Sequence, residues 1–358
     1  MVNWPWKWRQ APPPPINGAP VNGAPAHAAP AHATVYAPQS ATPLGQGGAT
    51  PFVTATQVLA EPPTPQRVGI LKSQAPARLF TPLLLQQAWL AVKRAGGGAG
   101  VDGVSLQAFA KRLKPELTRL HAELVAGDYR PQPLRQVVVP KPNGGLRPLA
   151  IWVLRDRIAQ RAVYALLAPT FESIFLPCSY GFRPGRSVEN AVQQVIEHRN
   201  AHQRWIVNAD IEHCFDELDC HLLLTLVGKR VQDELLLRYV RLWLQADILN
   251  SMDGVPRKAG ASQGSPLSPL LANIYLHEMD QAMIGQGLAF VRYADNFVIC
   301  CRRKGDAENA GMAAAAVLTR LHLTLNAGKS HIVHTDQGFA WLGYFFIRNE
   351  CHRIAGKG

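Results

Sequence analysis

The 358-residue sequence lacks a CxxC pair and a hydrophobic run long enough to cross a bilayer. Apolar runs such as Val163–Ala168 fall far short of the roughly 18 residues that a membrane span needs. The first residues, MVNWPWKWRQAPPPP, contain no apolar segment typical of a secretory signal. The six cysteines therefore argue against a zinc ribbon or disulfide scaffold and favour a reducing, cytoplasmic location. Membrane, secreted and collagenous proteins are excluded.

Metal-ligand spacing and common hydrolase motifs are also missing. The 12 histidines show no His/Cys ligand spacing, so the sequence predicts no transition-metal site. There is no Ser/His/Asp arrangement and no phosphate-binding GxxxxGK[ST] loop.

Acidic residues are scarce relative to basic ones. The chain has 25 Asp and Glu against 37 Lys and Arg, which gives a net charge of +12. Residues 1–66 hold only Lys7, Arg9 and Glu61, so +11 of this charge belongs to residues 67–358. A folded region this basic attracts phosphate backbones, although a simple solvated surface is an equal alternative on charge alone.

The N-terminal region differs from the rest in composition. Residues 1–66 contain 14 of the 28 prolines. Because proline lacks a backbone donor and fixes its own φ, this region is predicted to be a disordered Pro/Ala-rich tail. Trp4, Trp6 and Trp8 alternate at its start, either as a short docking peptide or as aromatics without a function.

From about residue 67 the pattern predicts an ordered α+β unit. Thr81-Pro82 begins a helix that ends at Gly96, and a second apolar helical face, with leucines at spacings of three and four, is split by Pro115. A hairpin is predicted around the Pro-Asn-Gly-Gly turn at 142–145. Further helices are predicted over 155–168, 187–199, 218–227, 233–246, 267–284 and 306–322, and strands over RWIVNADI, LAFVRY, FVICC, 330–335 and 340–347. Strands interleaved with helices indicate an α+β or α/β arrangement.

Two acidic residues stand at strand ends. Asp210 closes the apolar strand RWIVNAD, and Asp295 lies at the tip of the hairpin between LAFVRY and FVICC. Taken singly, such residues are common in turns and need no functional explanation. Their significance depends on the segments around them.

Eight segments occur in a characteristic order. They are GVDGVSLQAF (100–109), PKPNGGLRPLAIWVLRDR (140–157), SYGFRPGRS (179–187), NADIEHCFDELD (208–219), SQGSPLSPLLANIYLHEMD (262–280), RYADNFVIC (292–300), LNAGKSHIVH (325–334) and WLGYFF (341–346). Block by block, this series resembles bacterial reverse transcriptases of the group II intron type. The resemblance implies a right-hand polymerase with fingers over 67–200, a ferredoxin-like palm over 201–347 and a C-terminal tail over 348–358.

The resemblance assigns the acidic residues to metal binding. Asp210 and Asp295 match the two principal metal ligands of the family, and Ile211 contributes its backbone carbonyl. Polymerisation of dNTPs uses two divalent cations about 4 Å apart, for which Mg²⁺ is the expected metal and Mn²⁺ a substitute. The chain departs from the family at the hairpin tip, where Asn296 replaces the second Asp of Tyr-x-Asp-Asp. One charge fewer predicts weaker metal binding, with activity either retained or much reduced.

Other site residues follow from the same resemblance. Lys141 and Arg147 match positions that clamp the incoming triphosphate, and Phe215 matches the aromatic steric gate that excludes ribonucleotides. Gln263 and Lys329 match nucleotide-binding positions, although a solvated surface lysine is an equal alternative for Lys329. Four arginines are predicted either to contact the template or to buttress the fingers: Arg155, Arg157, Arg183 and Arg186.

The predicted activity is RNA-directed DNA synthesis from an RNA template and a DNA or RNA primer. About a dozen residues follow WLGYFF, so we expect no thumb or maturase region, and either low processivity or a protein partner that completes the grip. This compact build resembles reverse transcriptases found beside CRISPR adaptation modules and antiphage defence systems. Two alternatives remain: template-independent nucleotide addition, or an RNA-binding scaffold whose altered tip has lost its chemistry.

Overall fold

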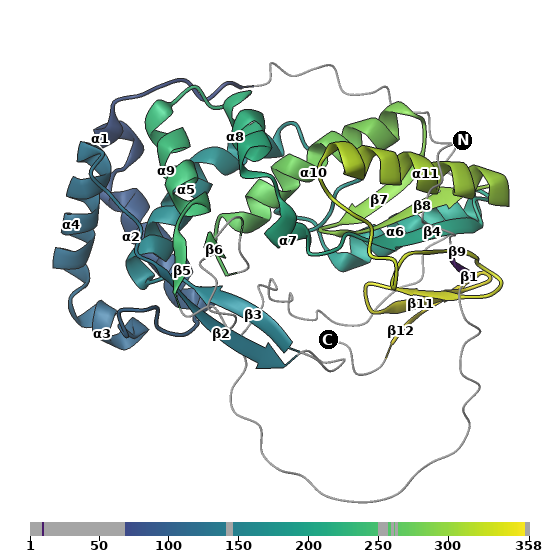
Figure 1. Ribbon diagram of the computed structural model, residues 1–358, viewed down its shortest axis with the longest axis horizontal. Helices are drawn as coiled ribbons and strands as arrows, with labels where there is room; N and C mark the ends of the chain where they lie inside the picture. The colour runs from purple at the N-terminus through teal and green to yellow at the C-terminus, as the bar shows by residue number, and fades with distance from the viewer. Residues whose placement is uncertain are drawn as a thin grey trace, which may run out of the picture.

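The computed structural model of the chain describes residues 9–10, 69–140, 146–249, 257–258, 261 and 264–354 (Figure 1). Most of the predicted tail, 1–66, lies outside the described residues. Arg9–Gln10, which the sequence placed in that tail, instead form strand β1 and pair in parallel with β9 (His331–His334). Backbone groups on an exposed sheet edge offer ready pairing partners, which accounts for this difference. None of the described helices is long and apolar enough to cross a membrane.

The fingers contain mainly helices in their first half. These are α1 (Pro76–Leu79), α2 (Pro82–Ala95), α3 (Leu106–Lys111), α4 (Leu113–Ala126) and α5 (Leu154–Glu172). Helix α2 begins as predicted, because the Thr81 hydroxyl accepts a hydrogen bond from the Leu84 N–H. The predicted break at Pro115 lies instead at Arg112, and Pro115 falls in the first turn of α4, where a missing N–H is tolerated.

The predicted hairpin is part of a larger sheet. Strands β2 (Leu134–Pro140) and β3 (Leu146–Ile151) pair antiparallel, as the sequence indicated. The short strands β5 (Asp247–Leu249) and β6 (Arg257–Lys258) extend it to four strands in the order β3-β2-β5-β6. A segment that follows the first palm strand in sequence therefore returns to the fingers.

Four strands of the palm form an antiparallel sheet with a ferredoxin-like strand order, and β1 adds to it in parallel. Strand β4 (Trp205–Asp210) lies between β9 and β8 (Asn296–Cys301), and β7 (Ala289–Tyr293) pairs with β8 at one edge. Together with β1 the order is β1-β9-β4-β8-β7. The central position of β4 places its last residue, Asp210, beside the β7–β8 turn.

Both faces of the palm sheet are covered, because its strands alternate two sets of apolar side chains. Val207, Phe297 and Ile299 belong to the larger core with α10 (Ser268–Gly285) and α11 (Lys304–Arg320). Ile206 and Val298 belong to a second core under α6 (Val188–Asn200) and a small sheet. Burial on both faces makes the sheet a rigid support for the turn at its end.

The small sheet contains β10 (Phe339–Trp341), β11 (Tyr344–Ile347) and β12 (Glu350–Arg353). The sequence assigned 348–358 to a C-terminal tail, but β12 pairs antiparallel with β11. The sequence did not predict this strand, because the side chains of Glu350–Arg353 are largely exposed and polar and therefore form no apolar pattern.

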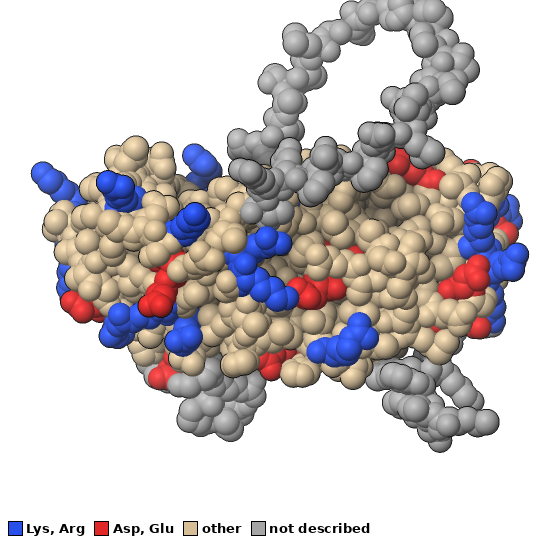
Figure 2. All heavy atoms as spheres, turned by 90° about the horizontal axis from the view of Figure 1, so that it is seen from above, with Lys and Arg blue, Asp and Glu red and all other residues tan. Residues whose placement is uncertain are grey.

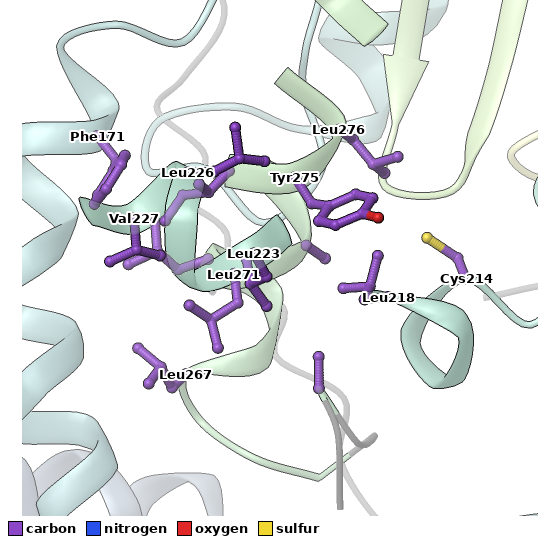
Figure 3. Close-up of a cluster of buried hydrophobic side chains, with 14 of the residues drawn as sticks. Phe171, Cys214, Leu218, Leu223, Leu226, Val227, Leu267, Leu271, Tyr275 and Leu276 are labelled. Atoms are coloured by element: carbon purple, nitrogen blue, oxygen red, sulfur yellow. The ribbon is translucent and has the colours of Figure 1, made fainter. Parts of the chain in front are cut away.

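The larger core continues from the palm into the fingers. Helix α8 (Cys220–Gly228) packs against α10, and both helices contribute to one buried cluster that includes Leu223, Val227, Leu271 and Tyr275 (Figure 3). The Tyr275 hydroxyl, although within this core, donates to the carbonyl of Leu321 at 2.6 Å. The short helix α7 (Cys214–Glu217), which the sequence did not predict, lies next to it.

Packing crosses the predicted fingers–palm boundary at residue 200. Helix α6, assigned to the fingers, packs on the palm sheet, whereas α9 (Glu234–Leu244), assigned to the palm, packs on the fingers. On α9, the Tyr239 hydroxyl donates to the Leu124 carbonyl and the Trp243 Nε1–H donates to the Tyr129 hydroxyl. The two regions thus exchange elements, and their division by residue number stays a prediction.

Candidate active site

The end of β4 and the β7–β8 turn bring Asp210 and Asp295 together. Asp210 stands opposite Asn296 in the β4–β8 register, and the N–H of Ile211 donates to the Asp295 carbonyl at 3.1 Å. The Asp210 carbonyl accepts from the N–H of Asn326 at 2.8 Å, which ties the same corner to the loop before β9. Two acidic residues 85 positions apart in sequence thus occupy one corner of the palm.

Two carboxylates, those of Asp210 and Asp295, place negative charge close together in this corner. Burial raises the pKa of Asp295 above its ordinary value, and the charge of Asp210 raises it further. Two groups partly offset the charge: Lys329 Nζ lies 3.0 Å from Asp210 Oδ1, and Asn296 Nδ2 donates to Asp295 Oδ1 at 3.2 Å. A carboxylate whose ionised form is disfavoured by its surroundings is a good place for a cation.

The donor set fits Mg²⁺ better than a softer metal. Its atoms are the carboxylate oxygens of Asp210 and Asp295, with the Ile211 carbonyl adjacent in sequence to the first. Within the described residues there is no group of three or more His, Cys, Asp and Glu side chains that could hold an ion by themselves. Mg²⁺ is commonly bound by one or two carboxylates together with water and substrate phosphates, so two carboxylates suffice.

Phe215 lies on α7, four positions beyond Ile211. Its half-buried ring meets the exposed ring of Phe182 edge to face, with 6.3 Å between centroids and 70° between planes. Both rings stand next to left-handed backbone: Phe182 itself has φ 60°, and His213 has φ 43°. Phe215 thus belongs to an aromatic pair on the segment that follows Asp210 and Ile211, and its role as a sugar-sensing ring stays a prediction.

Several predicted nucleotide-binding side chains cannot be placed. Lys141 and Gln263 lie outside the described residues. Arg147 lies on β3 opposite Val139, but its side chain is outside the described part of the structure. Their predicted contacts with the triphosphate and sugar stay predictions.

Two of the four predicted template-contacting arginines are used inside the protein. Arg157 is buried and donates from Nε to the Trp152 carbonyl at 2.8 Å. Arg183 is buried against the Phe175 ring, and its guanidinium pairs with Glu172 at 2.6 Å. For both residues the structure supports buttressing, the second of the two predicted roles, because a buried and bonded guanidinium cannot also contact a template.

The other two arginines are less enclosed. Arg155 forms an ion pair with Glu123 and lies over the Tyr129 ring at 5.2 Å from its centroid. Arg186 is half-buried, donates to the Pro177 carbonyl at 2.8 Å and lies over the Tyr180 ring. Template contact by these two stays a prediction.

Basic side chains do not gather into one continuous patch on the face seen in Figure 2. They are scattered over it, with acidic side chains among them. The net charge of the folded region therefore acts on this face as a diffuse field.

Arg292, which the sequence pattern did not single out, lies on β7 two positions before Ala294 of the turn. It is one of the largest fully buried side chains among the described residues, and its guanidinium forms an ion pair with the buried Asp280. A charged residue inside the apolar run AFVRY was the available signal, since arginine is almost never fully buried unless it is paired.

Comparison with known proteins agrees with the geometry. A family model described as reverse transcriptase (RNA-dependent DNA polymerase) matches residues 139–346, more than half of the chain. The chain belongs to the reverse transcriptase family. The match begins at the end of β2 and includes β3, the palm strands β4, β7, β8 and β9, and nearly all of β10 and β11, so it contains both acidic residues.

Curated relatives overlap with the chain to different degrees. Protein YkfC of Escherichia coli K12 is 35% identical over 317 residues, which cover 75% of this chain and 82% of YkfC. The group II intron-encoded protein LtrA of Lactococcus lactis is 33% identical over 196 residues, covering 54% of this chain but only 33% of LtrA. Among solved structures, telomerase from Candida albicans matches with a TM-score of 0.50 at 13% identity, over 70% of this chain and 52% of that one. This last likeness concerns the fold alone.

Proposed function

We propose that the chain is an RNA-directed DNA polymerase that extends a DNA or RNA primer with dNTPs. The observation that carries the proposal is the convergence of Asp210 and Asp295 at the end of β4, in a member of the reverse transcriptase family. Burial and the neighbouring charge of Asp210 raise the pKa of Asp295, which supports a role in holding metal ions.

Asp210 and Asp295 would hold two Mg²⁺ ions, with the Ile211 carbonyl as a further ligand. When bound, such ions activate the primer hydroxyl and neutralise the triphosphate. The Lys329 ammonium, 3.0 Å from Asp210 Oδ1, competes with a cation for that oxygen. Because Lys329 is exposed and its stem is flexible, it can release the carboxylate toward a metal and turn to the nucleotide phosphates.

Phe215 is the proposed selector of deoxyribonucleotides. Its ring is backed edge to face by Phe182, which limits how far it can retreat from a ribose. A ring packed beneath the sugar leaves no room for a 2′-hydroxyl. Lys141, Arg147 and Gln263 are proposed to contact the triphosphate and sugar, as their sequence positions suggest.

Asn296 favours one alternative function. It stands opposite Asp210 and donates its amide to Asp295, so it supplies a hydrogen bond where a second negative charge would strengthen cation binding. A polymerase-fold RNA-binding protein with weakened chemistry is therefore the second candidate. Template-independent nucleotide addition, a protein partner that completes the grip on the duplex, and a defence setting remain predictions from the family resemblance.

Primer extension tests the proposal. The purified chain is incubated with poly(rA)/oligo(dT), dTTP and either Mg²⁺ or Mn²⁺, beside the variants Asp210→Ala and Asp295→Ala and a reaction without poly(rA). We expect extension by the native chain alone, and only with template. Equal extension by all three proteins would contradict the site assignment, and extension without poly(rA) would favour template-independent addition.

A further inference from the structure

Arg292 is the centre of a buried polar network behind the turn. Its Nε and one Nη each donate to an oxygen of Asp280 at 2.6 Å, and both side chains are fully enclosed. The same guanidinium donates to the Asn273 side-chain oxygen at 3.0 Å and to the Ser179 hydroxyl at 2.8 Å. The fork therefore joins strand β7, helix α10 and the loop before α6.

One bond of this network reaches the turn itself. Arg292 Nη1 donates to the carbonyl of Ala294 at 3.0 Å, immediately before Asp295. Ala294 has φ 57°, a left-handed conformation that is unfavourable for a residue with a Cβ and needs support from its surroundings. On the other side, the Asp295 carbonyl accepts from the N–H of Ile211. Consecutive carbonyls of the turn are thus held from two directions.

The loop that contains Gly181 also packs against the turn, in addition to Arg292 and Ile211. A Cβ built on Gly181 would lie 2.4 Å from the backbone nitrogen of Ala294, so only glycine allows this approach. The Asn273 amide donates to the Gly181 carbonyl at 2.8 Å, which connects this loop to the Arg292 network through one side chain. The turn has little freedom to move while these contacts persist.

Stability alone does not explain this arrangement. A buried ion pair can often be replaced by apolar side chains of similar volume without loss of stability, because desolvation offsets the attraction. What an apolar pair cannot supply is the directed bond from a guanidinium to the Ala294 carbonyl. The network is thus better suited to fixing geometry than to adding stability.

We infer that Arg292 is a positioning residue, which clamps the left-handed turn so that the Asp295 carboxylate stays directed toward Asp210. This inference rests on the metal-binding site of the proposed function. Partners that orient a metal ligand from behind typically contribute about 10- to 100-fold to metal affinity.

The test uses Mn²⁺ titration of the full chain, followed by electron paramagnetic resonance, on Arg292→Lys and Gly181→Ala. The lysine retains the positive charge opposite Asp280 but lacks the several directed N–H donors of the guanidinium. Gly181→Ala displaces the turn and leaves both members of the ion pair in place. Arg199→Lys is the matched control: Arg199 is also buried and donates to the Glu350 carbonyl, but it lies on α6 away from the turn. We expect about 10- to 100-fold weaker Mn²⁺ binding in the first two variants and unchanged binding in the control.

Deuterium exchange at the Ile211 amide gives a second measurement that does not depend on metal. Its acceptor is the Asp295 carbonyl, so exchange should quicken in Arg292→Lys and Gly181→Ala but not in Arg199→Lys. If Arg292→Lys does not fold, Gly181→Ala alone decides the outcome. Native-like Mn²⁺ affinity and Ile211 exchange in Gly181→Ala would overturn the inference. Absence of Mn²⁺ binding by the native chain, with the exchange effect intact, would instead contradict the proposed function and still support the clamp.

Discussion

The palm and the fingers each bury a carboxylate completely, but they satisfy it differently. In the palm, Asp280 receives two charge-assisted hydrogen bonds from Arg292. In the fingers, Asp156 accepts from the Tyr129 hydroxyl at 2.7 Å and from the N–H of Gln132 at 2.8 Å, both of them neutral donors. Burial raises the pKa of Asp156 to about 7.

The two buried carboxylates therefore suit different purposes: Asp280 holds a fixed arrangement with Arg292, whereas Asp156 can change its protonation state. The Arg292 guanidinium keeps its charge throughout the ordinary pH range, so the hydrogen bonds that it donates behind the turn stay available. The fingers carry a carboxyl group that titrates near neutral pH. The corner formed by Asp210 and Asp295 is a third case. The two carboxylates lie close together and their negative charge is only partly offset, because cations are expected to supply the remaining positive charge.

The largest expected effect is that of Asp295→Asn, which tests whether the palm corner gives up stability for function. Loss of a metal ligand should remove several kcal/mol of transition-state stabilisation, or roughly a thousandfold in extension rate at about 1.4 kcal/mol per factor of ten. Because burial and Asp210 disfavour the ionised Asp295, the neutral variant should also have a higher Tm. A variant with a lower Tm and an unchanged extension rate would contradict both expectations.

Removal of one partner of the palm ion pair should have the next largest effect. Arg292→Met leaves Asp280 buried without its cation and should reduce the free energy of unfolding by about 3–5 kcal/mol, as measured by urea denaturation. The double variant Arg292→Met/Asp280→Leu should recover most of this stability, but not the tie to Ala294. Equal stability of the two variants would show that the pair does not behave as a buried ion pair.

The fingers should show a pH dependence that the palm pair lacks. Between about pH 4 and pH 7, the folded chain keeps a proton on Asp156 that the unfolded chain has lost. Stability from this group therefore falls as pH rises through that window, by about 1.4 kcal/mol per unit, and is level above it. In urea titrations at several pH values, Asp156→Asn should remove this slope, since asparagine remains neutral and retains an acceptor for the Gln132 N–H. If the free energy of unfolding depended on pH in the same way for the native chain and the variant, Asp156 would not be the source of the slope.

Asn296→Asp should have the smallest effect. It tests how an added negative charge beside Asp210 and Asp295 changes the Mg²⁺ requirement. A unit charge about 4 Å from another is worth about 1 kcal/mol in water, so we expect the Mg²⁺ concentration for half-maximal extension to fall by about fivefold. Asn349→Asp is a matched control, because Asn349 bonds to Arg204 on the exposed surface away from the corner. An unchanged Mg²⁺ requirement in Asn296→Asp would show that this position does not contribute to cation binding.

Local signals in the sequence were sufficient for much of the fold. Thr81 caps its helix where the sequence predicted the start, and Ser187 caps the helix predicted over 187–199, because a capping hydroxyl acts on N–H groups within three residues. The turn that carries Asp295 was found because two apolar strands flank it. These features depend on short-range chemistry that one segment contains in full.

The rest depends on tertiary packing. No local sequence signal indicates that β5 returns to pair with β2. None indicates that α6 packs on the palm or that α9 packs on the fingers. Arg157 and Arg183 look like nucleic-acid ligands in sequence, and only burial against Trp152 and Glu172 shows their structural use. The pairing of Arg292 with Asp280 spans two elements, so its role became visible only in the assembled palm.

The central claim is that Asp210 and Asp295 bind divalent cations jointly. Crystals of the full chain soaked with Mn²⁺ and measured at the manganese absorption edge would test it most directly. We predict an anomalous peak within coordination distance of oxygens from both carboxylates, and its loss in Asp295→Asn. A fully occupied peak bound elsewhere, or one retained in Asp295→Asn, would contradict the account.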